Sequence, residues 1–136
     1  MIQGISHITL AVTDLERAWL FYRDVLGCQP LARWRRGAYL LAGELWLCLS
    51  LDATASAAPR HDYSHVALSI SESAFADWCD RLVAAQIPQW QPNTSEGKSL
   101  YILDPDGHKL ELHCGSWQSR LATTKNVPYD DMEFFV

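Results

Sequence analysis

The chain has 136 residues and a mass of 15.4 kDa, which is the size of one ordinary domain. Its apolar fraction of 49% is close to the globular average, so the chain can bury a core. A formal net charge of −5 argues against a general binder of nucleic acid or anionic membranes, which rely on clustered Lys and Arg. No apolar run approaches the roughly 18 residues of a membrane span, and the N-terminus lacks a signal-peptide pattern. The four widely spaced cysteines form no Cys-x-x-Cys pair, which favours a reducing, cytoplasmic location.

The first half of the chain begins with alternating apolar and polar residues over 5–12, which predicts a half-buried strand. Asp14 is a good N-cap for the helix that follows, and Gly27 is expected to end it. Apolar residues recur in this helix at helical spacing: Leu15, Ala18, Trp19, Tyr22 and Leu26. Three strands are then predicted, over residues 29–35, 38–42 and 45–51.

The second half repeats this order of elements. A strand is predicted over residues 64–70, followed by a helix that Ser71 is expected to cap. The apolar positions of this helix are Phe75, Trp78, Cys79, Leu82 and Val83. Short strands are predicted over residues 89–91, 100–103 and 109–114, with an Asp-Pro-Asp-Gly turn at 104–107. The tail is expected to be irregular, except for one or two helical turns over 116–123.

The two halves align at an offset of 58 residues, at which Ser6-His7-Ile8 matches Ser64-His65-Val66. Both histidines lie on the non-core face of their predicted strands. The pattern therefore predicts an α+β fold built from two β-α-β-β-β modules. The expected modules are residues 4–51 and 63–114, joined by an Ala-rich connector over 52–62 and followed by a tail over 115–136. All of them belong to a single domain over residues 1–136.

His7, His65 and Glu111 form a candidate metal-binding set. The two histidines are equivalent in the repeat, so a pseudo-twofold axis would bring them to a common cleft. Glu111 lies in a strand between two leucines, where strand propensity does not favour an acid. Two histidines and one carboxylate bind divalent Mn, Fe, Co, Ni or Zn and leave coordination positions open. Cys48 matches Glu111 in the first half, so no fourth pseudo-symmetric ligand is expected.

Each of these side chains also has a simpler interpretation. A lone histidine is more often a hydrogen-bonded polar residue, and a strand glutamate often lies on a solvated face. His108 and His113 are rival ligands, but one follows a turn and the other ends a strand, so both rank below the set of three.

The string Ser-His-Ile-Thr-Leu-Ala-Val over residues 6–12 resembles the opening of the vicinal oxygen chelate superfamily, which has the glyoxalase/bleomycin-resistance fold. The string Asp-Pro-Asp-Gly-His-Lys-Leu-Glu over residues 104–111 is similar to the second signature of that superfamily. Within it, the chain most resembles the fosfomycin resistance glutathione transferases of Gram-negative bacteria. The matching pieces span nearly the whole chain in order: residues 37–40, 45–50, 62–65, 93–97, 120–122 and 128–129.

The resemblance implies a homodimer in which paired modules are exchanged between chains. It also implies that Mn²⁺ is bound by His65 and Glu111 of one chain and by His7 of the other. A K⁺ activator is implied as well, with ligands at Asn93, Ser95, Glu96, Gly97 and Ser99. From the residues alone, this loop is either a site for a hard cation or a polar turn.

The implied reaction is the opening of the epoxide ring of fosfomycin by the thiolate of glutathione or another small thiol. Because the thiol is external, no protein cysteine is needed as nucleophile. The implied catalytic residues are Thr9, Tyr39 and Arg120, with Arg120 as the partner of the phosphonate. The implied substrate-binding residues are Thr9, Trp46, Cys48, Tyr63, Gln91, Ser95, Ser99, Tyr101 and Arg120. Without the resemblance, Arg120 would be a solvated tail charge and Thr9 an ordinary strand residue.

The sequence departs from the family pattern at three positions. Gln91 replaces a lysine that pairs with the phosphonate, Thr94 replaces a basic residue near the thiol entry, and Val66 replaces an aromatic residue. The nearby bases nominated as substitutes are Lys98, Arg35 and Arg36. We therefore expect weaker turnover of fosfomycin than in a typical member, or a shifted preference for thiol or substrate.

Other functions of the same fold remain alternatives. A glyoxalase-type isomerase shares the fold and metal but usually has a fourth protein ligand where this chain has Cys48. An extradiol dioxygenase also uses two His and one Glu, but most are about twice this length. A drug-binding protein that sequesters its ligand is the non-enzyme alternative, and it lacks the metal-binding set.

Overall fold

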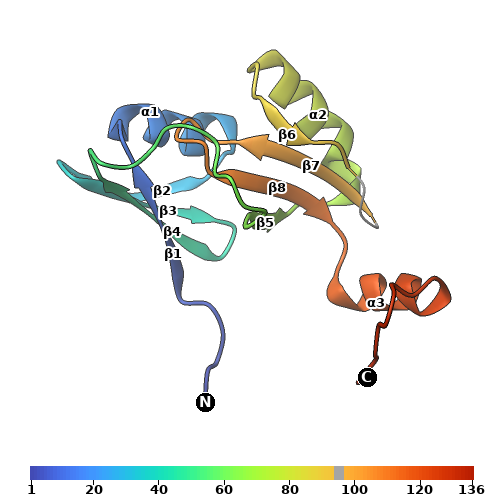
Figure 1. The fold of residues 1–136 in the computed structure, drawn as a ribbon. Coiled ribbons are helices and arrows are strands. Elements are labelled where there is room, and N and C mark those ends of the chain that lie inside the picture. Colours follow the sequence, from blue (N-terminus) through green and yellow to red (C-terminus); the bar gives the residue numbers. More distant parts are fainter. Residues whose placement is uncertain (94–96) are drawn as a thin grey trace.

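The computed structural model describes residues 1–93 and 97–136 and contains two four-stranded sheets (Figure 1). The first sheet has the order β1 (His7–Val12), β4 (Leu45–Leu51), β3 (Gly37–Ala42) and β2 (Gln29–Trp34). The second has the order β5 (Val66–Ser69), β8 (Lys109–Cys114), β7 (Lys98–Leu103) and β6 (Gln89–Gln91).

The two sheets confirm the predicted repeat, because strand order, strand direction and register are all shared. In each sheet the first strand is parallel to the last and the remaining pairs are antiparallel. Thr9 of β1 lies opposite Cys48 of β4, and in the second sheet Ala67 lies opposite Glu111. Cys48 and Glu111 therefore occupy equivalent positions, as the sequence alignment predicted.

The helices differ from the prediction in their details. Helix α1 (Leu15–Leu20) begins as expected, with the Asp14 carboxylate accepting the N–H of Arg17 at 3.0 Å, and continues into a π-helical turn, η1 (Phe21–Val25). The prediction that Ser71 caps the second helix is wrong. Its hydroxyl pairs with that of Ser73 at 3.2 Å, and a 3₁₀ turn, η2 (Glu72–Ala74), precedes α2 (Phe75–Ala84).

Two further expectations are corrected at the ends of helices. Val83 is exposed, whereas Leu82 beside it is the buried residue of α2. The tail forms a ten-residue helix, α3 (Trp117–Asn126), which is longer than the one or two turns expected. Its start is fixed by a capping box in which Ser116 and Ser119 each accept a backbone N–H of the other.

A single apolar core joins the two modules. Trp19, Phe21 and Tyr22, from α1 and η1, are buried in one cluster with residues of both sheets. The other members of this cluster are Leu10, Val12, Ala18, Leu26, Cys28, Ala38, Leu40, Leu47, Leu49, Leu82, Ile102, Leu110 and Leu112. The modules therefore share one hydrophobic interior.

Buried polar contacts across the module boundary form what we call the inter-module clasp, made by Thr13 and Tyr22 of the first module and Asp104 and Asp106 of the second. The Tyr22 hydroxyl donates to Asp104 at 2.7 Å, and both side chains are buried. The Asp106 carboxylate accepts the backbone N–H and the hydroxyl of Thr13, each at 2.8 Å. Burial, followed by the nearby Asp104 carboxylate, holds the pKa of Tyr22 well above its ordinary value.

The Asp-Pro-Asp-Gly turn supplies the acids of the clasp and forms as predicted, with the N–H of Gly107 donating to the Asp104 carbonyl at 3.1 Å. His108, which follows the turn, donates from Nε2 to the backbone carbonyl of Ala11 at 2.7 Å. This histidine is held in the module boundary and is not arranged as a metal ligand.

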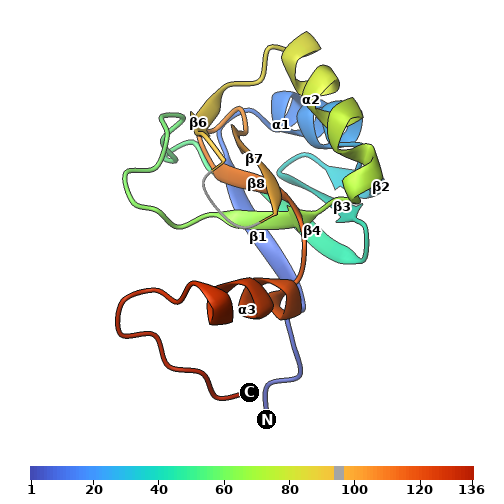
Figure 2. The ribbon, with the colours of Figure 1, turned by 90° about the vertical axis from the view of Figure 1, so that its right-hand side faces the viewer.

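Helix α3 extends from the end of β8 and lies apart from both sheets in two perpendicular views (Figures 1 and 2). Trp117 on this helix and Tyr129 after it are exposed. Among the described residues, no helix is both long and apolar enough to cross a membrane.

We expect Tyr22→Phe to destabilise the protein by about 1–3 kcal/mol, because it leaves a buried Asp104 oxygen without its donor. Burial already raises the pKa of Asp104, and the Tyr22 hydroxyl opposes that rise. Loss of the hydroxyl raises this pKa further above its unfolded value, so the stability contributed by Asp104 is lost as pH rises through it. The destabilisation is therefore expected to be larger at pH 7 than at pH 4. Urea unfolding at both pH values measures it.

The matched control is Tyr129→Phe, which removes an exposed hydroxyl and is expected to change stability by less than about 0.5 kcal/mol. Equal losses in the two variants, or no dependence on pH, would show that the clasp contributes nothing specific.

Candidate metal and substrate site

His65, which directly precedes β5, and Glu111 of β8 face each other. The Nε2 atom of His65 lies 3.0 Å from Oε1 of Glu111, and its Nδ1 lies 2.7 Å from the backbone carbonyl of Tyr63. Because a carbonyl can only accept, Nδ1 donates to Tyr63, and Nε2 is the ring atom that faces the carboxylate. A nitrogen and a carboxylate oxygen at this distance are held together by a cation between them, either a proton or a metal ion. The donor set therefore fits a divalent metal.

The second oxygen of Glu111 is also held. The Ser99 hydroxyl donates to Oε2 at 2.7 Å, and Nδ1 of His113 lies 3.1 Å from the same oxygen and 2.6 Å from Ser99 Oγ. The Glu111 and Ser99 side chains are buried. Contacts of this kind fix the orientation of a carboxylate. The Ser99 side chain therefore points toward Glu111. His113, which the sequence ranked low, is the histidine that touches Glu111 besides His65.

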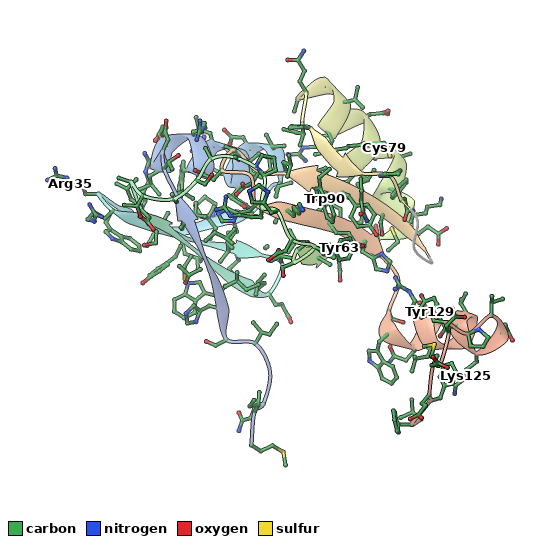
Figure 3. The ribbon with its side chains drawn as sticks, viewed as in Figure 1. Arg35, Tyr63, Cys79, Trp90, Lys125 and Tyr129 are labelled. Atoms are coloured by element: carbon green, nitrogen blue, oxygen red, sulfur yellow. The ribbon has the colours of Figure 1, made fainter. Side chains whose placement is uncertain are left out.

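Aromatic rings surround His65. Its ring lies 5.0 Å from that of Tyr63, 5.3 Å from Trp90 and 6.2 Å from Tyr101, centroid to centroid. Tyr63 and Trp90 lie near one another in the middle of the molecule (Figure 3). Trp90 was missed by the sequence reasoning, because a tryptophan in a short predicted strand is not distinguishable from a core residue.

Gln91 lies in the same row of the sheet as Glu111. It is opposite Tyr101 of β7, which in turn is opposite Glu111 of β8. Its amide donates to the Tyr63 hydroxyl at 3.1 Å. The structure therefore brings four predicted residues, Tyr63, Gln91, Tyr101 and Glu111, to one surface.

The first sheet carries a second group of predicted residues. His7 stacks on Trp46 at 4.6 Å, and Tyr39 lies 5.2 Å from Trp46. Thr9 and Tyr39 are both opposite Cys48 in the sheet, so all five residues share one region. The Trp46 indole N–H is buried and has no acceptor among the described residues.

The two groups remain separate in one chain. Within residues 1–93 and 97–136, no three His, Cys, Asp or Glu side chains come together to hold a metal ion. His7 lies on the first sheet, where its Nδ1 is 3.0 Å from the Ser6 hydroxyl, away from the His65–Glu111 pair. Arg120 lies on α3, outside both sheets.

The predicted potassium loop is described only in part. Asn93 donates from its amide to the Gly97 carbonyl at 3.1 Å. Ser95 and Glu96 lie outside the described residues, as does Thr94.

The bases nominated to replace the family lysine are held elsewhere in the chain. Lys98 lies 3.7 Å from Glu72 and over the ring of Phe75. Arg36 donates to the Leu51 carbonyl at 3.3 Å, and Arg35 lies at the outer end of the first sheet (Figure 3).

All four cysteines are free. Burial raises the pKa of the Cys28 thiol to about 11, so it is a thiol and not a nucleophilic thiolate at neutral pH. This agrees with a reaction that takes its sulfur from an external molecule.

The fold and the paired residues define a class of protein. The sequence pattern of the Glyoxalase/Bleomycin resistance protein/Dioxygenase superfamily matches residues 4–112, and the chain belongs to this superfamily. The α+β fold of paired modules is thereby confirmed.

Particular relatives narrow the comparison. The chain is 46% identical over 136 aligned residues to glutathione transferase FosA of Serratia marcescens, covering 98% of this chain and 96% of that protein. It is 36% identical to metallothiol transferase FosB of Staphylococcus haemolyticus, with both chains fully covered. The resemblance to fosfomycin resistance glutathione transferases is confirmed.

Solved structures agree with this placement. The fosfomycin resistance protein FosX of Mesorhizobium loti superposes with a TM-score of 0.76 at 31% identity, covering 89% of this chain and 99% of that one. A FosX variant of Listeria monocytogenes, complexed with Mn(II) and 1S,2S-dihydroxypropylphosphonic acid, superposes with a TM-score of 0.79 at 26% identity, covering 89% and 99%.

Proposed function

We propose that this protein is a metal-dependent thiol transferase that opens the epoxide ring of fosfomycin by adding glutathione, and so confers resistance to that antibiotic. The observation that carries this proposal is the approach of the His65 Nε2 atom to the Glu111 carboxylate at 3.0 Å. The names of the relatives support the reaction class, since FosA is a glutathione transferase and FosB a metallothiol transferase. A reducing cytoplasm, where glutathione stays a thiol, suits this chemistry.

His65 through Nε2 and Glu111 through Oε1 would hold the metal, and His7 would complete the set from a second chain. Mn²⁺ is the proposed ion, as in the FosX complex with Mn(II). When bound, a divalent metal acts as a Lewis acid toward the oxygen on which charge develops. The chain's own part is to keep both ligands ready: the Tyr63 carbonyl fixes the histidine tautomer, and Ser99 and His113 hold the carboxylate.

In the reaction, a bond forms between the thiolate sulfur and an epoxide carbon, the carbon–oxygen bond breaks, and the oxygen takes a proton. Thr9 is proposed as the hydroxyl donor to that oxygen. Tyr39, Trp46 and Cys48 would form the wall around the small substrate. The buried Trp46 N–H has no acceptor of its own among the described residues, which suits a donor to a bound anion.

Arg120 is the proposed partner of the phosphonate, because a guanidinium binds such groups through two parallel hydrogen bonds. Ser95 and Tyr101 are the further proposed donors, with Tyr63 and Gln91 beside them, whereas the Ser99 hydroxyl already donates to Glu111. Asn93, Ser95, Glu96, Gly97 and Ser99 are proposed to bind an activating K⁺.

A homodimer with exchanged modules is proposed because the metal ligands are divided between the two sheets of one chain. A second copy that presents its first sheet to this second sheet would unite His7 with His65 and Glu111. Helix α3, which stands apart from both sheets, is available for the same contact (Figure 2).

The decisive test is the formation of an adduct. Purified protein with Mn²⁺, K⁺, glutathione and fosfomycin is expected to consume both substrates in equal amounts, with mass spectrometry detecting their sum. Chelation of the metal is expected to abolish the reaction, and Na⁺ in place of K⁺ to slow it. The proposal fails if no thiol gives an adduct. Binding of fosfomycin to the metal-free protein without turnover would instead support the sequestering alternative.

The shared site predicts complementation between inactive variants. His7→Ala and Glu111→Gln are each expected to be inactive, whereas a refolded equimolar mixture recovers about one quarter of wild-type activity. Half of the randomly mixed dimers combine the two variants, and each of those has one intact site. A mixture as inactive as its components would show that one chain supplies all three ligands.

Gln91→Lys is expected to raise kcat/KM for fosfomycin by roughly tenfold, because an ammonium beside Tyr101 would contact the phosphonate directly. The matched control is Gln89→Lys, which adds the same charge at an exposed position opposite Ile102. Steady-state kinetics with fosfomycin varied measures the effect. No improvement at Gln91, or equal improvement in both variants, contradicts a limiting role for this residue.

A further inference from the structure

The imidazole ring of His113 lies between the buried acid Glu111 and the segment that leads from β8 into α3. His113 follows Glu111 by two residues in β8, so both side chains share one face of the strand, and Ser99 of β7 lies opposite His113. The Nδ1 atom of the ring is 2.6 Å from the Ser99 hydroxyl oxygen and 3.1 Å from Oε2 of Glu111. One edge of the ring therefore faces the acid.

The protons available to these three groups fix the direction of their hydrogen bonds. An ionised carboxylate can only accept, and the Ser99 hydroxyl donates its single proton to Oε2 of Glu111 at 2.7 Å. The Ser99 oxygen is then an acceptor, and Nδ1 of His113 is the donor that lies against it. Because Nδ1 presents its own hydrogen to this oxygen, the hydroxyl proton stays directed at the carboxylate.

The other edge of the ring is packed against two glycines. A Cβ atom at Gly115 would lie 3.0 Å from Nε2 of His113, and one at Gly97 would lie 3.3 Å from Cε1. Gly115 directly precedes Ser116, the N-cap of α3, and has a φ of +134°. The ring therefore fills space that a side chain at either glycine would take. It also places the start of α3 in contact with a group that holds Glu111.

We propose that His113 is a positioning residue for the metal. Its Nδ1–H donates to the Ser99 oxygen, and this donation keeps Oε2 of Glu111 engaged while Oε1 stays directed at His65. Because Gly115 packs against the ring, a change there alters metal affinity by moving the ring. This inference rests on the proposed function, since it concerns the ligands of the same metal ion.

The test measures the affinity of the full-length, metal-free protein for Mn²⁺, by calorimetry and by the EPR signal of free Mn²⁺, with no fosfomycin or thiol present. His113→Asn places an amide N–H where Nδ1 stands, and its affinity is expected to stay within about twofold of wild type. His113→Gln carries its amide one atom further out, and His113→Phe keeps a ring without a donor. Both are expected to bind Mn²⁺ about tenfold more weakly.

The order of these variants distinguishes positioning from packing. If the ring only filled space, His113→Phe would be the best replacement and His113→Asn the worst, because the smaller side chain leaves a cavity. Positioning by Nδ1 gives the reverse order. If His113→Phe does not fold, the comparison of His113→Asn with His113→Gln makes the same distinction. The control His61→Phe, at an exposed histidine of the connector, is expected to bind Mn²⁺ as the wild type does.

Gly115→Ala tests the same dependence from the other edge of the ring. The added methyl group would need the space beside Nε2, so the ring shifts and Mn²⁺ affinity is expected to fall about fivefold. The matched control is Gly43→Ala, which also has a positive φ, +62°, but has nothing within 4 Å of the added carbon. Its Mn²⁺ affinity is expected to stay at the wild-type value.

Three outcomes would overturn the proposal: wild-type affinity in all three His113 variants, an affinity that follows the size of the side chain, or equal losses in Gly115→Ala and Gly43→Ala. Because the assay contains neither substrate, it separates this inference from the proposed function. If no thiol reacts with fosfomycin but the variants show the expected order, His113 positions the metal ligand and the proposed reaction is wrong. If adducts form normally and no variant changes Mn²⁺ affinity, the reaction is correct and His113 has no positioning role.

Discussion

The buried hydrogen bond between Tyr22 and Asp104 is the contact on which the arrangement of the two modules depends. Apolar packing alone is tolerant of small shifts, because dispersion has no preferred direction. A buried carboxylate that needs its donor tolerates few alternatives, so the clasp fixes how the modules meet. The same turn that supplies Asp104 also places His108 against β1 and leads directly into β8, which carries Glu111. Module packing and metal-site geometry are therefore set by one short segment.

The proposed metal site depends on a buried acid, Glu111. Glu111 is nearly inaccessible to solvent, and isolated burial of its charge would be costly. Ser99 and His113 offset this cost through their contacts with Oε2, and Nε2 of His65 lies against Oε1. Ser99 and His113 both contact Oε2, which faces away from His65. Among the described residues, Oε1 is contacted by Nε2 of His65. The proposed ligands His65 and Glu111 are therefore held in position by contacts within the chain itself.

Much of the fold could be predicted because the two halves of the sequence show the same pattern. Each element predicted in one half could therefore be compared with its counterpart in the other. His65 and Glu111 could be paired from strand alternation and from the matching of Cys48 with Glu111, and the structure brings them together. The orientation of His65 could not be predicted, because it depends on the backbone carbonyl of Tyr63, and carbonyls are identical at every position. Ser71 was misassigned because several residues before α2 are compatible with a cap, and the chain inserts a 3₁₀ turn there. The length of α3 was underestimated because its sequence has no apolar stripe, and its start is set by two serines.

Cys48 and Glu111 occupy equivalent positions in the two modules but differ in chemistry, one a thiol and the other an acid. The second half retains the acid and its supporting hydrogen bonds, whereas the first half has a small neutral side chain there and surrounds it with Tyr39 and Trp46. The two modules therefore share a fold while presenting different side chains at equivalent positions, an acid in the second and a thiol beside aromatic rings in the first. Descendants of such a chain can change what they recognise through the first half without endangering the charge balance of the second.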